Sequence, residues 1–265
     1  MISDTAPLRG EWSERRRRFI WGFNVAGDCV GGLALLIGIP ALAGVHLAAV
    51  VLAPSSAASH DGSTLLLEVF VELLLCLGSV IFLFLLLVTN PGFVEMPTDF
   101  SCRCRRCGIE VEDFDHHCGA VGACIGKDNM CYFILFLLFT AMLCVLGAVQ
   151  NVAFVAAAMR ARSDNTGPSW ASRKVCIDAV FTALRSPRAL CLLVLSAVAV
   201  IGGAVCTFLC LRYTYLAYKG RSSRRRRRQV GAPGSLSAVF SKALHPTFSH
   251  NFHFPRDYSF EPVSV

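Results

Sequence analysis

Residues 65–88 have the sequence LLLEVFVELLLCLGSVIFLFLLLV, in which Glu68 and Glu72 are the only formal charges. These 24 residues are enough for a helix to cross the ~30 Å apolar core of a bilayer. Asn90-Pro91-Gly92 follows shortly afterwards, and both proline and glycine disfavour continuation of a helix. The stretch therefore predicts a transmembrane helix that ends at this turn.

Three further apolar stretches have bilayer length: residues 29–53, 133–159 and 189–211. Of the 265 residues, 54% are apolar and 16% are charged, whereas about a quarter of the residues in a soluble domain are charged. This composition excludes a disordered chain, a secreted disulfide scaffold and an ordinary cytosolic enzyme. We expect an all-α membrane protein with four transmembrane helices.

The polar segments divide this chain into five expected parts. The hydrophilic segment between the second and third helices is rich in cysteine, and both ends of the chain are basic. The parts are 1–18 (basic N-terminus), 19–92 (helices 1 and 2), 93–132 (cysteine-rich domain), 133–218 (helices 3 and 4) and 219–265 (basic, then aromatic tail).

The distribution of basic residues predicts the orientation. Eighteen lie in the two ends and the cysteine-rich segment, against six in the 160–188 loop and none in the 54–63 turn. Because cytoplasmic loops carry the excess of Lys and Arg, we expect both termini and the cysteine-rich segment in the cytosol, although the 160–188 loop argues the other way. The runs Arg15–Arg18 and Arg224–Arg228 flank helices, so they predict anchors to anionic lipid rather than a nucleic-acid surface.

Six of the thirteen cysteines lie between Cys102 and Cys131, beside the adjacent His116 and His117. Two kinds of chemistry are open here. Structural zinc takes a tetrahedron of cysteine and histidine ligands, often beginning with a C-x2-C turn. A nucleophilic thiol needs a base beside it and a carboxylate that orients the base. The candidates are Cys104, Cys107, His117 and Cys124 for zinc, and Asp115, His116 and Cys118 for catalysis.

Asp115-His116-His117-Cys118, in a chain with four expected spans, resembles the DHHC protein S-acyltransferases (palmitoyltransferases). Asn90-Pro91-Gly92 resembles the Asp-Pro-Gly motif of that family, and the spacing from Cys104 through Cys124 to Asn129 and Phe133 matches its cysteine-rich domain. The resemblance implies that Cys118 takes an acyl group from palmitoyl-CoA and passes it to cysteines of cytosolic or membrane-apposed proteins.

The same resemblance assigns the remaining residues. His116 removes the proton of Cys118, Asp115 holds the His116 ring, and a structural zinc is bound by Cys104, Cys107, His117 and Cys124. The lipid bilayer is the surrounding partner. We expect an endomembrane (Golgi or endoplasmic reticulum) or plasma-membrane protein.

The cysteine-rich domain is a degenerate version of the family pattern. The upstream C-x2-C is missing, and Arg103 and Glu110 stand at positions expected to carry a histidine and a cysteine. We therefore expect one zinc ion, not two. Gly119-Ala120 replaces the usual Pro-Trp, and no Thr-Thr-x-Glu follows the fourth helix.

These departures leave an alternative open: a zinc-stabilised membrane scaffold or binding protein with weak or no activity. A transporter is a weaker alternative, because helices 1–2 and 3–4 show no repeat. Joint retention of Asp115, His116 and Cys118 favours the enzyme.

Overall fold

The computed structural model describes residues 17–20, 23–26, 30–51, 62–94, 97–163 and 187–218. Most of the expected basic N-terminus, the 54–63 turn and the 160–188 loop lies outside the described residues, as does the whole 219–265 tail.

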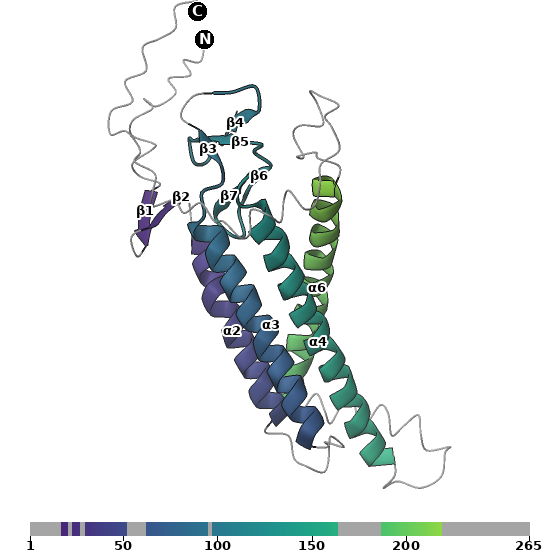
Figure 1. The fold of residues 1–265 in the computed structure, drawn as a ribbon. Coiled ribbons are helices and arrows are strands. Elements are labelled where there is room, and N and C mark those ends of the chain that lie inside the picture. The colour runs from purple at the N-terminus through teal and green to yellow at the C-terminus, as the bar shows by residue number, and fades with distance from the viewer. Residues whose placement is uncertain are drawn as a thin grey trace, which may run out of the picture. The chain divides into compact units, whose positions relative to one another are not determined.

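The part of the chain that the structure describes contains four long helices (Figure 1). They are α2 (Val30–Val51), α3 (Gly62–Val88), α4 (Met130–Ser163) and α6 (Pro187–Tyr218). Each contains a stretch long and apolar enough to cross a membrane: Val30–Ala49, Ser63–Val88, Met130–Ala153 and Val194–Tyr218. The prediction of four such helices, with the cysteine-rich segment between the second and third, is confirmed.

Most helix ends lie a few residues from those of the predicted stretches, and α6 continues to Tyr218 rather than ending at Leu211. Two of the helix starts have local reasons. Helix α4 begins at Met130 rather than Phe133, because the Asn129 carbonyl already accepts the Phe133 N–H at 3.2 Å. Helix α6 begins at Pro187, a residue favoured in the first turn because its missing N–H needs no partner there.

The described chain falls into two compact units, and each long helix contributes residues to both. Unit 1 comprises residues 1–35, 82–134 and 213–265, and therefore holds the cysteine-rich segment; unit 2 comprises residues 36–81 and 135–212.

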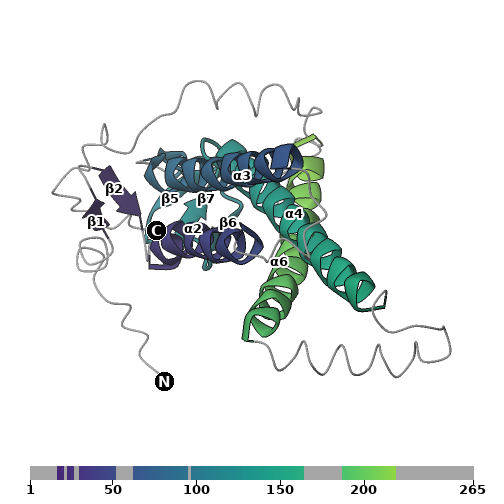
Figure 2. The ribbon, with the colours of Figure 1, turned by 90° about the horizontal axis from the view of Figure 1, so that it is seen from below.

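Within unit 2, α2 and α3 lie alongside each other (Figures 1 and 2), and His46 of α2 joins three helices. Its Nδ1 lies 3.0 Å from Glu72 Oε1 of α3, and its Nε2 lies 3.1 Å from Asn151 Oδ1 of α4. All three side chains are buried. A polar group away from water is costly unless it is paired, so this contact ties the three helices together.

The outward faces of the four helices are apolar. Ile37, Leu66, Val152 and Ile201, one from each helix, expose 66–72% of their surface. Large exposed apolar surfaces are unusual on a water-soluble monomer and are the normal lipid-facing surface of a membrane helix.

The cysteine-rich segment of unit 1 contains short antiparallel strands (Figure 1). The prediction of an all-α protein is wrong in this respect. Residues with positive φ at Gly108, Asp113 and Gly122 divide this segment into short runs, and its backbone groups pair across strands instead. The strands are β3 (Phe93–Val94), β4 (Ser101–Arg103), β5 (Glu110–Glu112), β6 (His116–Cys118) and β7 (Ala123–Ile125).

Strand β5 lies between β3 and β4, and β6 pairs with β7. A further hairpin of unit 1 joins β1 (Arg17–Ile20) to β2 (Phe23–Ala26). A small core underlies the cysteine-rich segment and consists of Cys104, Cys107, Val111, Phe114 and Cys124.

Candidate active site and metal centre

The β6–β7 hairpin separates the two adjacent histidines. Successive side chains of a strand point to opposite faces, so His116 and Cys118 share one face of β6 while His117 lies on the other. His117 pairs directly with Cys124 of β7, and directly opposed residues place their side chains on the same face. The pairing therefore groups His117 with the candidate metal ligands and His116 with Cys118.

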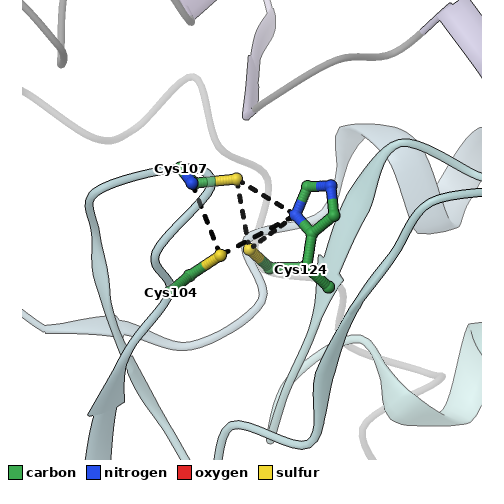
Figure 3. Close-up of side chains that lie close together, drawn as sticks. Cys104, Cys107 and Cys124 are labelled. Carbon is green, nitrogen blue, oxygen red and sulfur yellow. Dashed lines mark hydrogen bonds between the residues drawn. The ribbon is translucent and has the colours of Figure 1, made fainter.

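Four potential metal ligands lie close together, two from this hairpin and two from the C-x2-C turn. The ligand atoms of Cys104, Cys107, His117 and Cys124 all lie within 4.8 Å of one another. Figure 3 shows the sulfur atoms of the three cysteines pointing toward one another. Within the described part of the chain, this is the one group of three or more such residues that could hold a metal ion.

The distances in this group fit tetrahedral zinc. His117 Nδ1 lies 3.3, 3.8 and 3.6 Å from the sulfurs of Cys107, Cys104 and Cys124, and the Cys107 and Cys124 sulfurs are 3.4 Å apart. A tetrahedron with ordinary zinc–sulfur and zinc–nitrogen bonds has S···N edges of about 3.6 Å and S···S edges of about 3.8 Å. The donor set, three sulfurs and one imidazole nitrogen, also matches a common structural zinc site.

The C-x2-C turn is already shaped for a thiolate. The Cys107 N–H donates to Cys104 Sγ at 3.4 Å, and the Gly108 N–H donates to the Cys104 carbonyl at 2.8 Å. Hydrogen bonds from the Cys107 and Cys124 thiols lower the pKa of Cys104. A deprotonated sulfur is the form that binds a metal.

Asp115, just before β6, and His116, the first residue of β6, form a hydrogen-bonded pair. His116 Nδ1 lies 2.8 Å from Asp115 Oδ2, and the Asp115 side chain is 1% exposed. Since Asp115 accepts from Nδ1, the other ring nitrogen, Nε2, is left for Cys118. Burial alone would lower the pKa of His116, but its hydrogen bonds to Asp115 and Cys118 raise that pKa to about 9.

The Cys118 thiol is surrounded by donors. Burial alone would raise its pKa, but a hydrogen bond from His116 and two from the backbone N–H groups of Val121 and Ala120 lower it. The turn that supplies these N–H groups closes through a 2.7 Å bond from the Gly122 N–H to the Cys118 carbonyl. Gly122 has a φ of +75°, a conformation that residues with a side chain rarely adopt. This arrangement favours a thiolate beside a protonated imidazole.

Sequence reasoning missed two aromatic residues beside His116. Tyr213 of α6 stacks on the imidazole with ring centroids 5.5 Å apart, and Phe133 of α4 meets it edge-on at 5.6 Å. Phe133 had been noted only as part of a family pattern. Tyr213 carried no signal, because it stands 97 residues from His116 in an apolar helix.

Two asparagines hold the segment that carries the candidate site. Asn90 Oδ1 accepts the backbone N–H groups of Gly92 and Phe93 at 2.9 and 2.8 Å, which fixes the turn after α3. The buried Asn129 side chain accepts the Gly126 N–H and donates to the carbonyl of Cys124, both at 2.9 Å. Asn129 therefore connects a candidate metal ligand to the start of α4.

Arg103 and Glu110, which stand where the resemblance implies a histidine and a cysteine, lie directly opposite each other in β4 and β5. The Ser101 hydroxyl donates to Glu110 Oε2 at 3.2 Å. Oppositely charged residues in such a position stabilise a strand pair. The two positions thus lie on neighbouring paired strands.

The turn after Cys118 packs closely on the first turns of α2. A side-chain carbon at Gly31 would collide with the carbonyl of Ala120, and one at Gly32 would lie 2.6 Å from the Val121 carbonyl oxygen. Only glycine allows the backbone of the turn to approach this near.

We expect Gly31→Ala to destabilise the protein by about 1–3 kcal/mol, the cost of overpacking a filled contact. Thermal unfolding in detergent measures this effect. The matched control is Gly38→Ala in the same helix, where a methyl meets nothing within 4 Å. Unfolding temperatures that fall equally in both variants would refute the proposed contact.

The fold and site together define a class: a protein with four helices suited to a membrane and a compact Cys/His segment that carries an Asp-His-His-Cys strand. The family model for the DHHC palmitoyltransferases matches residues 98–230, half of the chain. The chain belongs to this family, which confirms the resemblance drawn from the sequence.

Individual relatives match over shorter stretches. Palmitoyltransferase ZDHHC22 of Rattus norvegicus is 37% identical over 71 residues, 27% of each chain. Palmitoyltransferase ZDHHC9 of Bos taurus is 45% identical over 76 residues, which are 25% of this chain and 21% of the relative. Palmitoyltransferase swf1 of Schizosaccharomyces pombe is 54% identical over 43 residues, 16% of this chain and 12% of the relative. The matches thus span about a quarter or less of each relative.

Proposed function

We propose that this protein is a protein S-palmitoyltransferase that carries the acyl group on Cys118. The observation that carries the proposal is the arrangement around His116: Asp115 holds Nδ1 at 2.8 Å, and Cys118 lies on the same face of β6. Membership of the DHHC palmitoyltransferase family supports the same reaction. Hydroxylamine-sensitive labelling of the purified protein with palmitoyl-CoA is the test.

The first step of the proposed chemistry involves His116, Cys118 and the acyl donor, with Asp115 holding the His116 ring. His116 takes the Cys118 proton, and the thiolate attacks the thioester carbonyl of palmitoyl-CoA. A carbon–sulfur bond to Cys118 forms as the bond to the CoA sulfur breaks, and the departing CoA thiolate takes the proton from His116. A cysteine thiolate of the acceptor protein then displaces Cys118 in the same way, which regenerates the enzyme.

We also propose that Cys104, Cys107, His117 and Cys124 bind one zinc ion. Zinc with four protein ligands has no open position and stabilises a fold without joining the reaction. The donor distances support this ligand set. The cross-strand pairing of Arg103 with Glu110 supports one ion rather than two, because those positions offer no sulfur or imidazole ligand.

His116→Ala and His117→Ala are expected to lose different properties, because His116 is assigned as the general base and His117 as a zinc ligand. His116→Ala should slow acylation by about 10²–10⁴-fold, the range for loss of a general base, while zinc content stays at the wild-type level. His117→Ala should lose zinc and become sensitive to protease. Zinc analysis and labelling of the two purified variants measure both effects. Zinc loss in His116→Ala with zinc retained in His117→Ala would reverse the assignments.

The proposed orientation places residues 93–132, the catalytic domain in this account, and both termini in the cytosol of an endomembrane or the plasma membrane. Acyl-CoA and cytosolic or membrane-apposed proteins are the proposed partners, and nucleic acid is not. The excess of basic residues in these segments supports the orientation.

Glycosylation acceptors engineered into single sites test this orientation. Acceptors within 54–63 and 160–188 should be modified, whereas one within 95–101 should not, because only lumenal segments meet the glycosylation machinery. Gel mobility before and after enzymatic deglycosylation gives the answer. Modification at 95–101 alone would invert the proposed topology.

A further inference from the structure

Tyr213 is the one buried residue among residues 211–218 of α6, whose other residues are exposed or partly exposed. It is 8% exposed, whereas Tyr215, two positions along the same helix, is 60% exposed. A buried tyrosine usually pairs its hydroxyl, and the Tyr213 hydroxyl lies 3.3 Å from His116 Nδ1.

The ring of Tyr213 also covers one face of the His116 imidazole. The two ring planes are 21° apart, with centroids separated by 5.5 Å. Phe133 meets both rings edge-on, at 5.6 Å from His116 and 5.2 Å from Tyr213, with interplanar angles of 67° and 76°. His116 is thus held by one stacked and one edge-on aromatic contact, both of which are favourable geometries.

These contacts restrict a motion that the Asp115 hydrogen bond leaves possible. One hydrogen bond at Nδ1 allows the imidazole to swing about that nitrogen, which carries Nε2 toward or away from Cys118. A ring stacked on the imidazole opposes this swing, because tilting the imidazole breaks the stack and runs into Phe133. The Tyr213 hydroxyl adds a second, longer contact at Nδ1, a shared arrangement of one N–H between two acceptors.

We propose that Tyr213 is a positioning residue, which with Phe133 holds the His116 ring so that Nε2 faces Cys118. This inference rests on the proposed function, in which His116 takes the proton of Cys118. Tyr213 acts through His116 and is assigned no contact with the acyl donor. General acid–base catalysis depends on reach within hydrogen-bond distance, so a small displacement of the base has a large effect on rate.

Single-turnover acylation of the full-length protein in detergent tests this role, with palmitoyl-CoA varied. Tyr213→Leu removes the stack and is expected to lower the maximal rate constant by about 10- to 100-fold, with the half-saturating palmitoyl-CoA concentration changed less than about threefold. Tyr213→Phe keeps the ring and should stay within about fivefold of the wild type, the loss of one ordinary hydrogen bond. Tyr215→Leu is the matched control and should behave as the wild type.

A second measurement does not depend on activity. Nuclear magnetic resonance spectra of protein labelled with ¹⁵N-histidine report the His116 ring directly, and His116→Gln identifies its signals. Tyr213→Leu should shift these signals by removing a stacked ring, while Tyr213→Phe should shift them less and Tyr215→Leu should not.

The two measurements separate failure of this inference from failure of the proposed function. If the wild type forms no thioester, the proposed function fails, and the spectra alone decide whether Tyr213 holds the His116 ring. Wild-type acylation in Tyr213→Leu, or unshifted His116 signals, would overturn the inference. So would a rate loss that Tyr213→Phe does not rescue, or one that follows loss of zinc from the variant.

Discussion

Cys118→Ser is expected to reduce hydroxylamine-sensitive acylation of the purified protein by at least about a hundredfold. A thiol with an ordinary pKa is only a few per cent thiolate at neutral pH, so attack on a thioester depends on local activation. The hydrogen bond from His116 and the N–H groups of the following turn lower the pKa of Cys118 and supply that activation. A serine hydroxyl stays protonated in the same position, and any oxygen ester it formed would resist neutral hydroxylamine.

Cys102→Ser is the matched control for this substitution. Cys102 lies in β4 of the same segment, is partly buried and packs against the small core of Cys104, Cys107 and Cys124 without joining the metal-ligand group. Its replacement should leave acylation near the wild-type level, as measured with the same labelled palmitoyl-CoA. Wild-type labelling of Cys118→Ser would show that a different cysteine is the nucleophile.

Cys104→Ala is expected to abolish the proposed zinc binding and to unfold much of the cysteine-rich segment. In zinc-finger peptides the metal contributes about 10–16 kcal/mol of apparent binding free energy at neutral pH, and that energy is folding energy. Cys104 lies 2% exposed within the small core, so losing its sulfur also leaves a cavity there. Acylation should decrease together with the zinc content of the variant, although Cys118 is still present.

Metal analysis and limited proteolysis of purified protein check this prediction. The wild type should contain about one equivalent of zinc, in keeping with one four-ligand site, and should resist cleavage between residues 97 and 129. Cys102→Ala should match the wild type in both measurements. Two equivalents of zinc in the wild type, or undiminished zinc in Cys104→Ala, would contradict the assigned ligand set.

The four helices could be predicted from the sequence because their signal is local. Residues 65–88 are apolar over a full bilayer thickness. Inside a bilayer the backbone N–H and C=O groups of a single segment can pair only with one another, which requires a helix. The composition of the C-x2-C turn and its distance to His117 and Cys124 likewise indicated a metal site before any geometry was known. The structure brings those four residues together.

The strands of the cysteine-rich segment could not be predicted in this way. Each is two or three residues long. An alternation of apolar and polar residues cannot be recognised over so short a run. The adjacency of His116 and His117 predicts only that the two side chains do not do the same job. The β6–β7 register, in which His117 lies opposite Cys124, appears only in the fold.

The contacts of His116 with Tyr213 and of His46 with its partners depend on long-range packing. Tyr213 is 97 residues from His116, and Asn151 is 105 residues from His46. Neither pair belongs to a spaced motif that the sequence alone would reveal. Only the packing of separate helices shows which polar groups satisfy one another.

The most direct test of the account is the mass of the peptide that carries Cys118, taken after brief incubation of purified, zinc-loaded wild-type protein with palmitoyl-CoA. The account predicts a palmitoyl group on Cys118 that neutral hydroxylamine removes and that an added acceptor protein discharges. Palmitate confined to other cysteines, with Cys118 unmodified throughout, would contradict it.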